Sequence, residues 1–121
     1  MLIVYASKTG NVQRFVQKLP LERNLKISSG EESINEPCVL LTYTTGLGEI
    51  PEEVKRFVSQ NQQFIKGIAA SGNRNWGTSF GKAAITLNQQ YGFPILHTFE
   101  MSGQRKDIAV FMEGVNTLVT N

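Results

Sequence analysis

The stretch LIVYASKTGN, residues 2–11, decides the fold class of this chain. Its first half, Leu2–Ala6, is a continuous apolar run, which is typical of a strand buried on both faces of a parallel sheet. Its second half, Ser7–Asn11, is small and polar, as expected for a loop that joins such a strand to a helix. An apolar stripe with helical spacing follows directly. It consists of Val12, Phe15, Val16 and Leu19.

The rest of the chain continues this alternation of strands and helices. Further apolar runs predict strands at Leu25–Ser28, Cys38–Thr44, Gly67–Ser71 and Pro94–Phe99. Apolar stripes predict helices after Pro51, over Phe80–Tyr91 and over Ile108–Val119. Residues 29–37 are too few and too polar for a covering helix, so a loop or a single turn is expected there. The order predicts an α/β fold with a doubly wound, five-stranded parallel sheet and a short or absent helix between strands two and three.

Length, charge and cysteine content exclude several classes of protein. The 121 residues predict a single domain over residues 1–121, since single cores are commonly built from about 100 to 150 residues. A net charge of +2, with scattered Lys and Arg, argues against nucleic acid as a partner. The first apolar run lacks a basic leader and is too short for a membrane span, so a cytoplasmic protein without a membrane partner is expected. Cys38 is the one cysteine and is predicted to be a small buried hydrophobe.

Three predicted strands end in polar loops that contain glycine. These loops are Ser7–Asn11, Thr44–Pro51 and Gly72–Gly77. Ligands of open parallel sheets bind outside the carboxyl ends of the strands. The three loops are therefore expected to line one binding site.

The loop Ser7–Asn11 has the composition of a phosphate cradle. The hydroxyls of Ser7 and Thr9, the amide of Asn11 and free N–H groups at the helix start would grip a phosphate, and Gly10 permits close approach of the backbone. The same residue types are favoured as helix caps, so both interpretations stay open. The chain has neither a Gly-x-x-x-x-Gly-Lys-Ser/Thr motif nor a Gly-x-Gly-x-x-Gly motif after the first strand, which argues against a nucleotide triphosphatase and a dinucleotide fold.

The other two loops contain glycines and an aromatic residue that are compatible with a ligand site. In the second loop, Gly46 and Gly48 flank Leu47, and both glycines allow a positive φ and rotation of the backbone beside a ligand. A plain turn before a Pro-initiated helix is the alternative. In the third loop, Trp76 precedes Gly77 and can stack on a flat ring, while Asn73 bonds the edge of that ring. An ordinary packing role for the tryptophan is the alternative.

Together these motifs resemble a known family. LIVYASKTGN, LTYTTGLGEIP (residues 41–51) and ASGNRNWG (residues 70–77) are similar to the flavodoxin-like ribonucleotide reductase stimulatory proteins, the NrdI family. The resemblance spans essentially the whole chain. The third motif discriminates, because general flavodoxins share the first motif but not the third.

The resemblance implies a strand order of 2-1-3-4-5 and a non-covalently bound flavin mononucleotide (FMN). It further implies a redox activator of class Ib ribonucleotide reductase rather than a stand-alone enzyme. Reduced family members react with oxygen and deliver superoxide to the reductase small subunit, where it oxidises a dimanganese site so that a tyrosyl radical forms. An unidentified electron donor is then a further partner. A general electron-transfer flavodoxin and a cofactor-free interaction module are the alternatives.

The resemblance also implies a set of cofactor-binding residues, without a catalytic side chain or a metal site. The set is Ser7, Lys8, Thr9, Gly10, Asn11, Thr44, Thr45, Gly46, Leu47, Gly48, Ser71, Gly72, Asn73, Trp76 and Gly77. The first loop would take the phosphate, and the other residues would line the flavin. The stretch Met101–Gly103 is expected to complete the site or a partner surface. His97 is expected to have a structural role.

Overall fold

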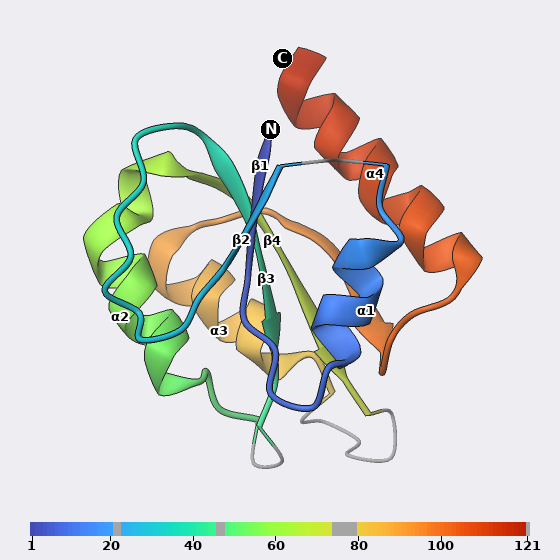
Figure 1. The fold of residues 1–121 in the computed structure, drawn as a ribbon, viewed down its shortest axis with the longest axis horizontal. Helices are drawn as coiled ribbons and strands as arrows, with labels where there is room; N and C mark the ends of the chain where they lie inside the picture. The colour runs from blue at the N-terminus through green and yellow to red at the C-terminus, as the bar shows by residue number, and fades with distance from the viewer. Residues whose placement is uncertain (21–22, 46–47, 74–79, 121) are drawn as a thin grey trace.

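A computed structural model describes residues 1–20, 23–45, 48–73 and 80–120 of the chain. Its strands form one parallel sheet in the order β2-β1-β3-β4-β5, as predicted. The strands are β1 (Leu2–Tyr5), β2 (Asn24–Lys26), β3 (Cys38–Tyr43), β4 (Ile65–Gly72) and β5 (Ile95–Glu100). Because all of them run the same way, the loops after β1, β3 and β4 leave the sheet at one edge (Figure 1).

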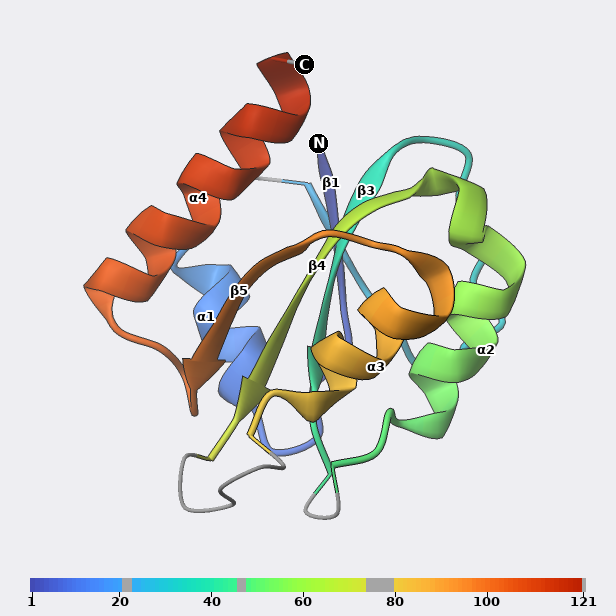
Figure 2. The same cartoon turned by 180° about the vertical axis from the view of Figure 1, so that it is seen from behind.

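Helices cover both faces of the sheet. They are α1 (Asn11–Gln17), α2 (Glu52–Asn61), α3 (Lys82–Tyr91) and α4 (Arg105–Thr120), and a short 3-10 turn, η1 (Gln62–Phe64), precedes β4. Figures 1 and 2 show α1 and α4 on one face and α2 and α3 on the other. This is the doubly wound arrangement expected from the alternating apolar patterns.

Each face has its own apolar core. On the α1 and α4 face, the ring of Phe15 stacks on Phe99 with centroids 4.0 Å apart and meets Phe111 edge-on at 5.6 Å. On the other face, Phe57 of α2 and Leu87 of α3 pack against the sheet. Cys38 is fully buried in this second core, as predicted, and burial raises the pKa of its thiol to about 12. The thiol is therefore an apolar packing group.

The connection between β2 and β3 contains no helix, which confirms the expectation for residues 29–37. Its place is taken by a loop tied to the end of α2. The buried side chain of Asn61 accepts a hydrogen bond from Ile34 N at 3.0 Å and donates one to Glu32 O at 2.8 Å. The Glu32 carboxylate accepts the N–H groups of Ser28 and Gly30 at 2.7 and 2.9 Å. These bonds lower the pKa of Glu32, although its desolvation opposes the change.

The predicted element boundaries need small corrections. β4 begins at Ile65 instead of Gly67, and β2 is shifted to Asn24–Lys26. Val119 is 62% exposed, although the sequence placed it on the buried stripe of the last helix. The reason is visible in Figure 1, where the last turns of α4 project beyond the sheet. In the described ranges, no helix combines the length and the apolar character needed to cross a lipid bilayer.

Candidate functional site

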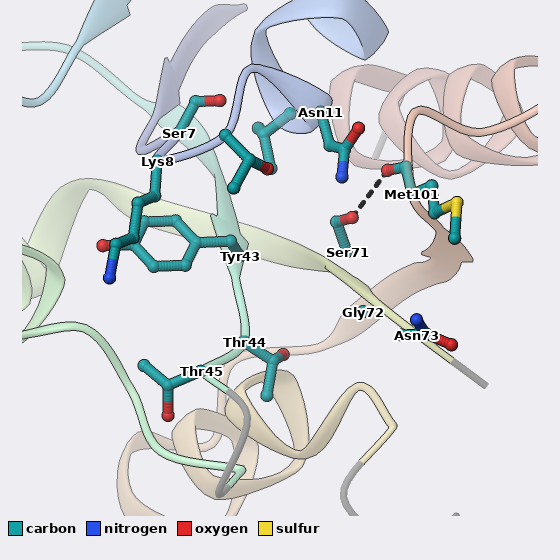
Figure 3. Close-up of a pocket in the computed structure, with 12 residues that line it drawn as sticks. Ser7, Lys8, Asn11, Tyr43, Thr44, Thr45, Ser71, Gly72, Asn73 and Met101 are labelled. Carbon is teal, nitrogen blue, oxygen red and sulfur yellow. Dashed lines mark hydrogen bonds between the residues drawn. The ribbon is translucent and has the colours of Figure 1, made fainter. Parts of the chain in front are cut away.

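A cavity of about 360 Å³ opens at the carboxyl edge of the sheet. The predicted residues that line it come from the loop after β1 with the start of α1, from the loop after β3, and from the end of β4 (Figure 3). They are Ser7, Lys8, Thr9, Asn11, Thr44, Thr45, Ser71, Gly72 and Asn73. The structure thus brings together side chains that lie more than sixty positions apart in the sequence, at the place where open parallel sheets bind ligands.

The first loop both caps α1 and borders the cavity. Ser7 Oγ accepts a hydrogen bond from Gln13 N at 3.2 Å, so this hydroxyl caps α1. Thr9 and Asn11 also line the cavity. Gly10 does not line it, but its φ of +90° turns the backbone into the helix, and Arg14 lies against it.

The second loop places a buried hydroxyl at the cavity. Thr44 is 3% exposed, and its Oγ1 has no hydrogen-bond partner within the described part of the chain. Thr45 accepts two hydrogen bonds from the described residues that follow, since its carbonyl accepts one from Gly48 N at 2.8 Å and its Oγ1 accepts one from Glu49 N at 3.0 Å. An unpaired buried hydroxyl is costly, which makes Thr44 Oγ1 a candidate ligand contact.

The end of β4 is hydrogen-bonded to the turn that follows β5. Ser71 Oγ donates a hydrogen bond to Met101 O at 2.6 Å, and Met101 N donates one to Gly72 O at 2.9 Å. Met101 has a φ of +53°, the only positive φ of a non-glycine residue in the described ranges. The residue is 51% exposed although it lines the cavity (Figure 3). A bulky residue in this conformation is strained, and such strain is concentrated at functional sites.

Some predicted residues lie elsewhere, and others were missed. Gly48 is described but does not line the cavity, and Gly46, Leu47, Trp76 and Gly77 lie outside the described residues. The predicted set of site residues did not include Val12 and Tyr43, whose apolar patterns indicated core packing. Burial raises the pKa of the Tyr43 phenol to about 12, and the hydrogen bond that this phenol donates to Glu53 at 2.8 Å contributes to the same shift. It is therefore a neutral donor at physiological pH.

His97 has a structural partner at the start of α4. Its Nε2 lies 2.8 Å from Asp107 Oδ1, and Asp107 Oδ2 accepts the N–H of Gln104 at 2.7 Å. Although burial opposes it, this pairing lowers the pKa of Asp107. The described residues contain no group of three or more His, Cys, Asp or Glu side chains that could hold a metal ion.

The fold is that of solved flavodoxins. A short-chain flavodoxin associated with a bacterial microcompartment aligns with a TM-score of 0.72 and 20% identity, over 98% of this chain and 95% of that one. A flavodoxin of Streptococcus pneumoniae TIGR4 aligns with a TM-score of 0.69 and 20% identity, over 98% of this chain and 97% of that one. At this level of identity, the likeness establishes the fold alone.

Sequence similarity establishes the family. The family model described as "NrdI Flavodoxin like" matches residues 3–113. A Bacillus licheniformis protein named Protein NrdI is 50% identical over 118 residues, which cover 98% of this chain and 89% of that protein. The sheet order, the loops around the cavity and these matches agree with the resemblance carried by the sequence motifs. The chain therefore belongs to the NrdI flavodoxin-like family.

Proposed function

We propose that this chain holds one FMN in the cavity at the carboxyl edge of its sheet and acts as the redox activator of a class Ib ribonucleotide reductase small subunit. NrdI and flavodoxin family proteins bind FMN, and the chain belongs to the NrdI family. The observation that carries the proposal is the convergence of the predicted loops on one cavity. In this role the protein is an accessory of the reductase rather than an independent enzyme.

The residues at the cavity suit a phosphorylated flavin. The cavity volume of about 360 Å³ lies within the range of about 300 to 1,000 Å³ that ligand pockets span. The buried Thr44 Oγ1 lacks a partner in the described ranges, and a polar ligand atom would satisfy it. Lys8 and the amide of Asn11 supply the positive charge and the hydrogen-bond donor that an anionic phosphate needs.

The proposed roles of the residues follow from their positions. Thr9 and Asn11 bind the phosphate end, Thr44 bonds a polar edge of the ring, and Asn73 approaches the ring from β4. Trp76 remains the predicted stacking partner. When bound, FMN supplies one-electron chemistry toward oxygen, which produces superoxide for the dimanganese site of the partner. The described side chains position the cofactor for this chemistry and contribute no metal cluster of their own.

The decisive experiment uses the FMN-loaded protein after anaerobic reduction. It is mixed with oxygen and manganese-loaded class Ib small subunit, and the tyrosyl radical is measured by electron paramagnetic resonance. We expect the radical to form. The matched control replaces this protein with an equally reduced general flavodoxin, which should give no radical.

The remaining outcomes select between the alternatives. Reduced protein that passes electrons to an acceptor but yields no radical with the small subunit would identify a general electron carrier. Purified protein that is colourless and takes up no added FMN would leave only a cofactor-free interaction module.

Met101 provides a test of which turn contacts the cofactor. We expect Met101→Gly to raise the Kd for FMN about fivefold, since the lost apolar contact contributes about 1 kcal/mol. The free energy of unfolding without FMN should change by less than about 1 kcal/mol, because relief of the positive φ offsets the greater chain entropy of glycine. Fluorescence titration and urea denaturation measure the two quantities. Met101→Leu is the control and should keep the affinity; an unaltered Kd in Met101→Gly would remove this residue from the site.

A further inference from the structure

Asn11 stands between the cavity and a polar network that the sequence motifs did not indicate. Arg14 donates one hydrogen bond from Nη2 to Asn11 Oδ1 at 2.6 Å and another from Nε to Ser102 Oγ at 3.0 Å. Ser102 Oγ in turn donates to Asn11 Oδ1 at 3.0 Å. The three side chains form a closed triangle between α1 and the turn after β5.

The chemistry of this triangle determines which way the Asn11 amide faces. A guanidinium has only donors, so Ser102 Oγ must accept from Arg14 and use its own proton toward Asn11. Both bonds to Asn11 therefore require an acceptor, which the amide oxygen supplies. The amide nitrogen therefore faces away from Arg14 and Ser102, and in the view of Figure 3 it points toward Ser71 at the cavity. No described residue accepts a hydrogen bond from it.

The network also fastens the loop before α1 to the turn that carries Met101. A Cβ atom on Gly10 would lie 2.8 Å from Arg14 Nη1, so the absence of a side chain there lets the guanidinium lie over the loop. Lys18, one helical turn further along, donates to the carbonyls of Ser102 and Gly103 at 3.3 Å. Arg14 of α1 and Lys18 at the end of this helix thus hold the turn against α1 and the loop that borders the cavity.

We propose that Arg14 is a positioning residue that, together with Ser102, presents the Asn11 amide as a hydrogen-bond donor and so favours FMN over its unphosphorylated counterpart, riboflavin. This inference rests on the proposed function, because it assigns the phosphate of FMN to the donor side of Asn11. A phosphate oxygen only accepts hydrogen bonds, so an amide held in the opposite orientation would repel it. Arg14 acts through Asn11 and has no contact with the ligand in this assignment.

The test compares the Kd values of FMN and riboflavin, measured by flavin fluorescence with the full-length protein. In Arg14→Met the apolar stem remains while all donors are lost. We expect the Kd for FMN to rise about tenfold and that for riboflavin to stay within about twofold, since one charge-assisted hydrogen bond is affected. Ser102→Ala, which keeps the guanidinium, should raise the Kd for FMN about threefold. Arg56→Met removes the same charge from α2, on the other face of the sheet, and should alter neither Kd.

A double-mutant cycle separates positioning from simple charge attraction. In an Asn11→Ala background, Arg14→Met should cause no further loss of FMN affinity, because the group that it orients is gone. A second tenfold loss would show that Arg14 attracts the phosphate independently and would overturn the inference. Equal losses for FMN and riboflavin would overturn it too, and if Arg14→Met does not fold, the same criteria apply to Ser102→Ala. A wild-type protein that binds no FMN would instead refute the proposed function.

Discussion

Replacement of Phe15 by alanine is expected to lower the free energy of unfolding by about 3 to 5 kcal/mol, the range for deleting a buried aromatic ring. The ring of Phe15 is fully buried, stacks on Phe99 at 4.0 Å and meets Phe111 edge-on. It also packs closely against the turn after β5, because a Cβ on Gly103 would lie 2.7 Å from Phe15 Cδ2. Deletion of the ring would therefore remove the packing contacts that α1 makes with the sheet, with α4 and with this turn.

Urea denaturation at one fixed FMN concentration measures the effect on Phe15. Phe15→Leu, which keeps most of the apolar volume, should lose only about 1 to 2 kcal/mol. Val110→Ala on α4 is the surface control, since Val110 is 45% exposed, and it should change stability by less than about 0.5 kcal/mol. A loss of under about 1 kcal/mol in Phe15→Ala would contradict the packing described for this face.

Replacement of Asn61 by leucine is expected to cost about 2 to 4 kcal/mol, because the partners of a buried polar side chain would be left without hydrogen bonds. Leucine has a similar size, so the effect isolates the polar contacts. Asn61 is 1% exposed and serves Ile34 N, Glu32 O and Phe57 O at 3.0, 2.8 and 3.0 Å. The variant thus removes the hydrogen bonds that hold the loop between β2 and β3, where a covering helix is absent.

The chain offers a matched control for Asn61. Asn88 on α3 also donates a side-chain hydrogen bond, to Phe93 O at 2.8 Å, but Asn88 is exposed. Water can replace that bond, so Asn88→Leu should cost less than about 1 kcal/mol in the same denaturation experiment. Equal losses in the two variants would show that burial of Asn61 is not what makes its bonds important.

The cavity was predictable from local signals to a large extent. Each of the loops that contribute to it follows an apolar run and contains small polar residues, and parallel strands bring such loops to one edge. Met101 was only loosely anticipated, because its positive φ depends on hydrogen bonds from Ser71 and to Gly72, about thirty positions earlier. Tyr43 was missed, since an aromatic residue at the end of a buried run looks like ordinary core. Trp76 as a ring contact stays a prediction.

By itself, the sequence determined the alternation of strands and helices, the parallel sheet, the missing helix at residues 29–37 and the family motifs. These follow from hydrophobic periodicity and loop composition, which are local properties. Only the tertiary structure decided that Asn61 supports the β2–β3 loop and that Arg14 meets Ser102, 88 positions away. The physical reason is that a polar side chain finds its partner by the packing of distant elements, and no spacing along the chain records that meeting.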